Sequence, residues 1–240
     1  MKTFSFRSDG LKLDGTFFYP SNKKEKNPTI LFVHGWTGER KRSFQYAQSL
    51  SKLGYICMLF DMRGHGTSEG DINTFTIGDF FSDVTAAYDY LSKTEGVDPE
   101  NISAVGSSFG GYLIPQLAEK RKIKNLALRV PADYPNEDFN KLKKFSSGEN
   151  PKILSWRNKS KKFSKTFALS AIHNFPGKIL VIESEKDDIV PHQTILNYLN
   201  AVKDRNKLTH IIMKDAPHSI PEGKFRDEIE KTLISWFSKI

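Results

Sequence analysis

The chain has 240 residues, of which 38% are hydrophobic and 27% are charged, and its formal net charge is +8. This composition predicts one globular domain. The sequence contains no apolar stretch of roughly 20 residues and no apolar signal segment, so we predict that the chain does not span a membrane and is cytoplasmic. The single cysteine, Cys57, cannot form an internal disulfide, and no recognition motif accompanies the positive charge, so no nucleic-acid partner is expected.

The N-terminal third begins with a predicted hairpin and continues into a buried strand. Residues 3–7 and 13–20 form the two arms of the hairpin, and Ser8, Asp9 and Gly10 supply its turn. A charged loop follows. The continuous apolar run TILFVHG at 29–35 ends in glycine, which is typical of a strand buried on both faces.

The rest of the chain alternates apolar strand patterns with helical patterns. Because this alternation implies parallel crossovers, it predicts an α/β fold with a mostly parallel central sheet and helices on both faces. The expected strands lie at 55–64, 101–108, 125–130, 178–185 and 209–215, and the expected helices at 43–54, 77–93, 109–121 and 222–240.

Residues 133–176 interrupt this alternation with a polar, lysine-rich stretch that contains scattered aromatic residues. Nine basic and three acidic residues between 137 and 165 give a net charge of +6, most of the chain's excess. The lysines form either a solvated face or a surface that attracts anionic substrates or membranes. We expect one domain, residues 1–240, with 133–176 as a short lid or cap insertion between core strands.

Two adjacent serines, Ser107 and Ser108, follow a strand pattern and precede a helical one. A serine at a sharp strand-to-helix turn leaves little room for side chains two residues to either side. Glycines occupy both positions around Ser108, at Gly106 and Gly110, whereas a valine and a phenylalanine occupy them around Ser107. The spacing therefore predicts Ser108 as a nucleophile and Ser107 as a packed neighbour.

The motifs FVHGWTG, FDMRGHGTSEG, GSSFGG, SEKDDIVP and APHS occur in this order along the chain. In this combination the chain resembles the α/β-hydrolase fold superfamily, over nearly its whole length outside 133–176. It resembles most the small serine esterases of the feruloyl or cinnamoyl esterase and acylglycerol lipase type. Ser107 departs from the pattern, because many relatives have a larger polar residue there.

Six histidines compete for the role of the base that activates the serine. His218 lies in the turn-rich stretch DAPHSIPEG after the last strand, and the superfamily's chain order of serine, acid and histidine implies that it is the base. The alternative is an exposed loop histidine. The other candidates lie in loops before the nucleophile, in the insertion, at a helix start or inside a strand: His34, His65, His173, His192 and His210.

Two adjacent carboxylates, Asp187 and Asp188, follow a buried strand. Resemblance to the family's D-x-x-V-P pattern favours Asp187 as the acid that orients the histidine. Asp188 and Asp133 remain alternatives, the latter because some relatives place the acid after the preceding strand. Asp215, three residues from His218, is interpreted as structural.

The resemblance also implies an oxyanion hole made by the backbone N–H groups of Trp36 and Phe109. The resulting hypothesis is a carboxylesterase that acts on feruloyl, cinnamoyl or short-to-medium acyl esters without metal or organic cofactor. Its partner is a small-molecule ester, and a homodimer is compatible with the sequence. The alternatives are a thioesterase, an aminopeptidase-like serine peptidase, or a non-catalytic ligand-binding protein that kept the fold.

Overall fold

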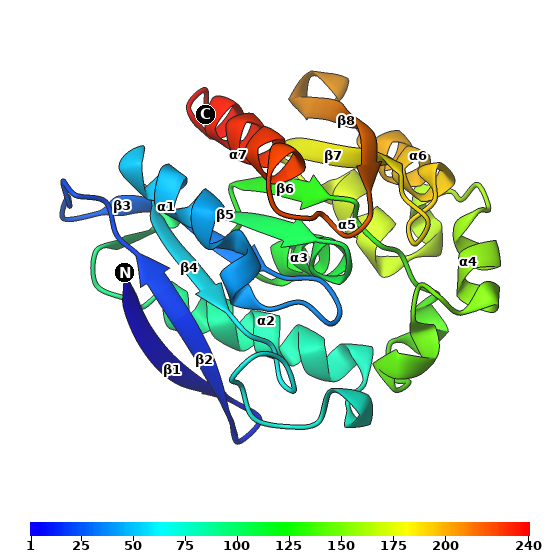
Figure 1. The fold of residues 1–240 in the computed structure, drawn as a ribbon, viewed down its shortest axis with the longest axis horizontal. Helices are drawn as coiled ribbons and strands as arrows, with labels where there is room; N and C mark the ends of the chain where they lie inside the picture. The colour runs from blue at the N-terminus through cyan, green and yellow to red at the C-terminus, as the bar shows by residue number, and fades with distance from the viewer.

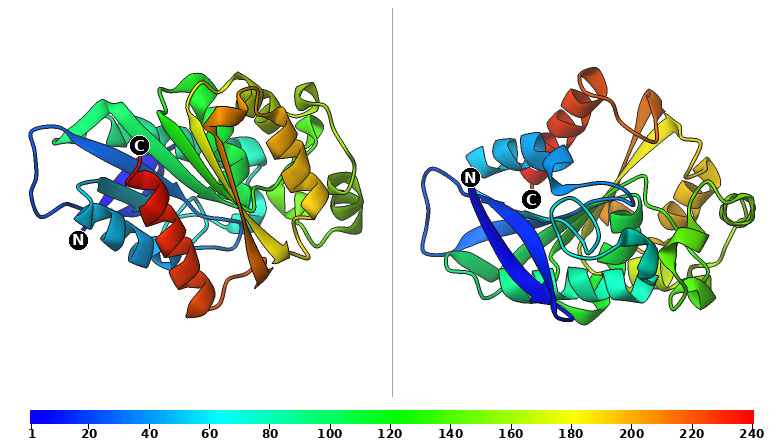
Figure 2. Two further views of the ribbon diagram at one scale, coloured as in Figure 1. Left: turned by 90° about the horizontal axis from the view of Figure 1, so that it is seen from above. Right: turned by 60° about the horizontal axis from the view of Figure 1, so that its bottom comes forward.

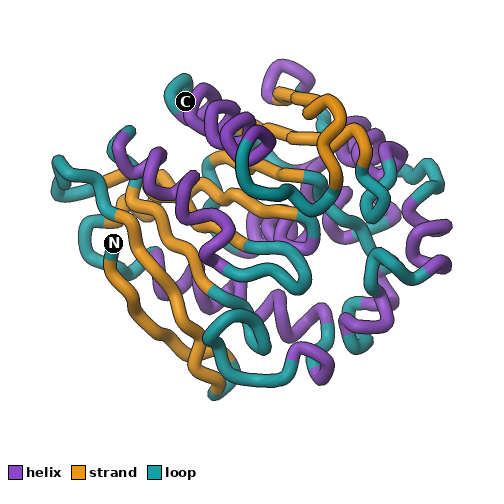
Figure 3. The backbone as a smooth tube through the Cα atoms, viewed as in Figure 1, coloured by secondary structure: helices purple, strands orange, loops and turns teal.

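The computed structural model describes residues 1–240 and places an eight-stranded sheet between two layers of helices (Figure 1, Figure 3). The strand order is β1-β2-β4-β3-β5-β6-β7-β8, in which β2 pairs antiparallel with β1 and β4 and all other neighbours are parallel. The predicted α/β fold is confirmed. The strands are β1 (Lys2–Ser8), β2 (Leu11–Phe18), β3 (Asn27–Val33), β4 (Ile56–Phe60), β5 (Val97–Ser107), β6 (Asn125–Arg129), β7 (Lys178–Lys186) and β8 (Leu208–Pro217).

The helices divide between the two faces of the sheet (Figure 2). One face packs on α2, α3, α5 and α6, and the other on α1 and α7, which contact each other. Successive side chains of a strand point to opposite faces, so Leu126 and Leu128 enter one core and Ala127 the other. This burial on both faces explains the continuous apolar runs. The helices are α1 (Phe44–Lys52), α2 (Ile77–Leu91), α3 (Phe109–Lys120), α4 (Pro151–Arg157), α5 (Phe167–Asn174), α6 (His192–Ala201) and α7 (Lys224–Phe237).

None of these helices is both long and apolar enough to cross a membrane.

The stretch expected as an insertion, residues 133–176, lies between β6 and β7 and contains α4, α5 and three 3₁₀ turns but no strand of the sheet. It is bonded to the start of α2 through Gly78 N–H to Phe139 O at 2.8 Å, and to α6 through Asn197 Nδ2 to Lys159 O at 3.0 Å. Helix α5 packs on α3. The segment therefore joins two helices on the same side of the sheet. The role of this segment as a lid or cap stays a prediction.

Six of its nine basic residues are exposed and Lys161 is half-buried, whereas Lys143 and Arg157 are buried, so the prediction of a surface, solvated or anion-attracting, is wrong for these two. Local sequence does not reveal this, since both side chains are enclosed by residues distant in the chain. The exposed six are Lys141, Lys144, Lys152, Lys159, Lys162 and Lys165.

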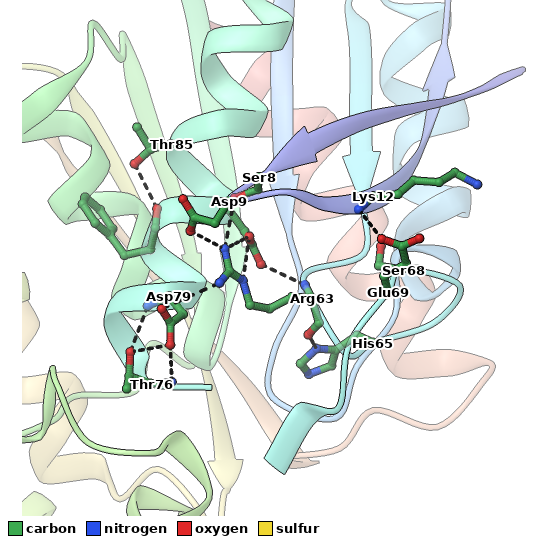
Figure 4. A network of polar contacts seen from close by, with 12 residues as sticks. Ser8, Asp9, Lys12, Arg63, His65, Ser68, Glu69, Thr76, Asp79 and Thr85 are labelled. Atoms are coloured by element: carbon green, nitrogen blue, oxygen red, sulfur yellow. Dashed lines mark hydrogen bonds and ion pairs between the residues drawn. The ribbon is translucent and has the colours of Figure 1, made fainter. Parts of the chain in front are cut away.

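A buried ion pair ties the predicted hairpin to the sheet and to α2 (Figure 4). The guanidinium of Arg63 donates from Nε and Nη2 to Oδ1 of Asp83 at 2.9 and 2.6 Å, and from Nη2 to the hairpin turn at Asp9 Oδ2, 2.7 Å, and Ser8 Oγ, 3.1 Å. The side chain of Asp83 is fully buried, and this burial raises the pKa of its carboxyl group. The pair thus fixes three separate segments around one desolvated charge.

Removing Asp83 leaves the buried guanidinium of Arg63 with only the more exposed carboxylates of Asp9 and Asp79, so we expect Asp83→Leu to lower the free energy of unfolding by about 3–5 kcal/mol. The double variant Arg63→Met/Asp83→Leu, which removes both charges, should lose less than the single one. Urea unfolding followed by circular dichroism measures both. A single variant within about 1 kcal/mol of the parent protein, the usual size of an exposed ion pair, would contradict this role.

Candidate active site

Ser108 occupies a strained turn between β5 and α3. Its φ is 51° and its ψ is −110°, a conformation that residues with a side chain rarely adopt. The loop after β6 fixes both peptide groups: Ser108 N–H donates to Arg129 O at 2.9 Å, and Ala132 N–H donates to Ser108 O at 3.0 Å. The sharp turn expected from the sequence is present at Ser108.

The glycines two residues to either side of Ser108 are sterically required. A Cβ atom on Gly106 would lie 2.6 Å from the carbonyl oxygen of Gly110, and one on Gly110 would lie 2.2 Å from the carbonyl oxygen of Val33. Both contacts are with backbone and cannot relax by a rotamer change. Ser107 lines the same cavity as Ser108, and its Oγ accepts from Arg129 Nη1 at 3.1 Å.

His218, directly after β8, forms a hydrogen-bonded pair with Asp187, directly after β7. His218 Nδ1 lies 2.7 Å from Oδ2 and 2.9 Å from Oδ1 of Asp187. The same Oδ1 accepts the backbone N–H groups of Ile189 at 2.9 Å and Val190 at 2.7 Å, so the loop itself orients the carboxylate. The side chains are 14% and 3% exposed for His218 and Asp187. His192 and His210 also bond a carboxylate, that of Glu183, but of these three histidines it is His218 that lines a cavity together with Ser108.

The other aspartates considered as the acid form neither a hydrogen bond nor an ion pair with His218. Asp188 is exposed and forms no ion pair. Asp133 is fully buried, neither of its carboxylate oxygens has a hydrogen-bond partner, and burial raises its pKa to about 7. Asp215 forms an ion pair with Lys186 at 2.5 Å, in keeping with the structural role expected of it.

Two other histidines brace the loop that contains Trp36. His34 Nε2 accepts the N–H of Met62 at 3.1 Å, and His65 Nε2 accepts the N–H of Thr37 at 3.3 Å. Burial lowers the pKa of both rings, that of His34 to about 3, so they stay neutral and keep an acceptor nitrogen. They hold the loop rather than exchange protons with a substrate.

The same loop packs directly against Ser108. A Cβ atom on Gly35 would stand 3.3 Å from Cβ of Ser108, and the turn closes through Gly38 N–H to Gly35 O at 3.0 Å. Phe109 begins α3, so its N–H has no acceptor within the helix. No turn or loop hydrogen bond uses the N–H of Trp36 or of Phe109. The assignment of these two N–H groups to an oxyanion hole stays a prediction.

Sequence reasoning missed a buried cation behind these two donors. Lys143 is fully buried, and its Nζ lies 4.5 Å from the ring centroid of Trp36, 5.1 Å from that of Phe109 and 4.9 Å from that of Tyr134. Nζ also donates to Ser146 O at 3.1 Å. Burial lowers the pKa of Lys143 well below its usual value. Cation–π contacts therefore connect the insertion to the backbone around Ser108.

A cavity of about 140 Å³ opens beside Ser108 and His218, between the sheet and helices α1 and α7. An engineered protein cavity of about 150 Å³ holds benzene, so this one accommodates a small group. Arg129, a second residue that sequence reasoning missed, lines it.

No group of three or more histidine, cysteine, aspartate or glutamate side chains is arranged to hold a metal ion.

The known proteins to which this chain is similar share its type of fold, and several of them are named as hydrolases. Residues 41–240 match the model of the prolyl oligopeptidase family. The chain is 27% identical over 221 residues to the human palmitoyl-protein thioesterase ABHD10, mitochondrial, a match that covers 83% of this chain and 69% of that protein. It is 33% identical over 90 residues to the thermostable monoacylglycerol lipase of Bacillus sp. strain H-257, covering 38% of this chain and 34% of the lipase.

Solved structures extend the likeness to the whole fold. Est1E from Butyrivibrio proteoclasticus with bound ferulic acid superposes with a TM-score of 0.76 at 17% identity, covering 98% of both chains. Mouse alpha/beta hydrolase domain-containing protein 10 superposes with a TM-score of 0.69 at 20% identity, covering 100% of this chain and 99% of that one. At such identities the likeness shows the fold alone.

The adjacent aspartates provide a matched test of the acid. Asp187→Asn should slow fluorophosphonate labelling of Ser108 by about 10³- to 10⁴-fold, because an amide no longer holds the imidazole in the required tautomer. Its remaining oxygen can still accept the N–H groups of Ile189 and Val190, so the fold should persist. Mass spectrometry of the labelled peptide gives the rate. Asp188→Asn is the control, and equal slowing in both variants would rule out Asp187 as the specific partner.

The orphaned carboxyl of Asp133 makes stability depend on pH. Its pKa is about 7 in the folded protein and 3.8 for the unperturbed group, so the unfolded chain releases this proton first and the folded state loses stability as pH rises from about 4 to 7. Asp133→Asn, which stays neutral, should remove that loss. Urea unfolding at pH 4.5 and 7.5 measures it, and parallel pH dependences for the two proteins would contradict it.

Proposed function

The chain belongs to the prolyl oligopeptidase family, and we propose that it is a serine hydrolase that cleaves carboxylic esters through a covalent acyl-enzyme. The observation that carries the proposal is that His218, bonded to Asp187, lines one cavity together with the strained Ser108. Hydrolases among the relatives support the reaction class. The function assigned to each residue is our inference.

In the first half-reaction, Ser108 Oγ attacks the ester carbonyl carbon while Nε2 of His218 accepts the hydroxyl proton. The carbonyl electrons move onto oxygen, and as they return the C–O bond to the alcohol breaks. His218 then gives its proton to the departing alkoxide. Asp187, bonded to Nδ1 at 2.7 Å, stabilises the imidazolium formed between these two transfers. Water repeats the sequence on the acyl-enzyme and releases the acid.

Negative charge on the carbonyl oxygen would be stabilised by the N–H groups of Trp36 and Phe109. The second lies at the N-terminus of α3, where the helix dipole favours an anion. Loss of one such donor typically costs ~10²- to 10³-fold in rate. Lys143 packs on both aromatic rings behind the same site.

We further propose that residues 133–176 act as a cap over the active site within a single domain. Lys143 of this segment contacts Trp36, and the bridge between Leu142 and Thr76 anchors the segment next to α2. These contacts support a cap that helps to shape the loop that contains Trp36. Its basic residues that remain exposed lie outside the cavity lining.

Thioester hydrolysis is the second candidate, favoured by the match to a palmitoyl-protein thioesterase over 83% of this chain. Esters, thioesters and amides pass through the same tetrahedral intermediate, so the catalytic groups do not separate them. The small cavity favours a short acyl group over a palmitoyl chain. The family name leaves an aminopeptidase-like activity as a third substrate class.

Fluorophosphonate should modify one serine, Ser108, and Ser108→Ala should lose both the adduct and all turnover of p-nitrophenyl esters. Ser107→Ala is the matched control and should keep both, because Ser107 serves only as a neighbour of Arg129. Parallel assays with short acyl-CoA and aminoacyl anilides rank the substrate classes. An adduct on Ser107, or no adduct, would refute the catalytic assignment; faster acyl-CoA or anilide turnover would replace the ester assignment.

A further inference from the structure

Arg129 holds a positive charge next to the proposed nucleophile. It is the last residue of β6, and its carbonyl oxygen accepts the N–H of Ser108 at 2.9 Å. Its side chain lies on the α1/α7 face of the sheet, like that of Ala127, and its guanidinium donates to Ser107 Oγ at 3.1 Å and to the carbonyl oxygen of His218. Arg129 is thus bonded to both sides of the reaction centre.

No carboxylate forms a direct ion pair with this guanidinium, although the charge of Asp187 acts on it at longer range. Arg129 takes part in none of the ion pairs within 4.0 Å, and its Nε is buried without an acceptor. The buried guanidinium of Arg63 in contrast contacts the carboxylates of Asp83 and Asp9. A partly desolvated cation that lacks a counter-ion in the protein is unfavourable, and a bound anion would offset that cost.

The cavity beside Ser108 has the composition of an anion site. Arg129 lines it together with Arg42 and Arg226, and no aspartate or glutamate does, although Arg226 also pairs with the exposed Glu222 at 3.3 Å. Hydroxyl groups of Tyr46, Ser43 and Ser219 line it as well. The remaining wall, formed by residues such as Phe32, Ile182 and Leu233, is apolar. Guanidinium groups in apolar surroundings bind carboxylates strongly, because both partners are charged and form paired hydrogen bonds.

We propose that this cavity is a subsite for a carboxylate at the end of a short acyl chain, so that the substrates are half-esters of small dicarboxylic acids. The inference rests on the proposed function and adds the substrate class to it. The acyl group is assigned to the cavity because it stays attached to Ser108, whereas the alcohol must leave. At about 140 Å³ the cavity holds a chain with roughly the bulk of a benzene ring.

The test compares mono-p-nitrophenyl adipate with p-nitrophenyl adipamate, which has a neutral carboxamide in the same place. For the parent protein we expect kcat/KM to be at least about tenfold higher for the adipate, the lower range for a hydrogen bond to a charged group. In Arg129→Met and Arg226→Met this ratio should fall toward one, whatever the absolute rates. Arg7→Met, an exposed arginine of the hairpin, should keep the parent ratio.

A binding measurement separates failure of the subsite from failure of the proposed function. Calorimetry with adipate, adipamide and inorganic phosphate on Ser108→Ala reports the subsite without turnover. Binding of adipate alone, lost with Arg129→Met, supports the subsite even if no ester is cleaved. Ester cleavage without preference for the adipate, no adipate binding, or binding of phosphate in its place would each overturn the subsite.

Discussion

Ser108 keeps its positive φ because three elements meet at its backbone. Strand β5 delivers it to the edge of the sheet, the turn after β6 bonds its N–H and its C=O, and Gly110 allows α3 to start against Val33. Strain of this kind persists only where the surroundings over-determine it. The neighbouring Val130 also has a positive φ, 39°, which is unusual for a β-branched residue. The loop that clamps the serine is therefore itself strained.

The parallel order of β5, β6, β7 and β8 accounts for the rest of the arrangement. Parallel strands end at the same edge, so Ser108, Asp187 and His218, which are far apart in sequence, each follow a strand there. Open α/β sheets bind ligands at this edge. The loop Gly35–Gly38 follows β3, the neighbour of β5, and so reaches the same point. The order and direction of the strands, rather than any local motif, bring these residues together.

Local patterns predicted the features that depend on local constraints. The two glycines around Ser108 distinguished it from Ser107, and alternating apolar runs predicted the sheet and both helical layers. The catalytic roles remain predictions. Lys143 and Arg129 could not be recognised, because nothing near them in sequence differs from an exposed lysine or a strand arginine. Their environments come from residues such as Trp36 and His218, which only the tertiary fold brings near.

The two basic residues that sequence reasoning missed, Lys143 and Arg129, lie next to the site, and its motifs alone do not imply them. Lys143 lies behind the proposed oxyanion donors, Arg129 lies beside Ser107, and the N-terminus of α3 adds a partial positive charge. Asp187 is bonded to His218 and two backbone amides and forms no ion pair with Arg129, although its charge acts on that guanidinium at longer range. An anionic acyl group raises the negative charge of the tetrahedral intermediate by one. In the proposed reaction Arg129 would bind the distal carboxylate, and the N-terminus of α3 with the two backbone N–H groups would stabilise the oxyanion.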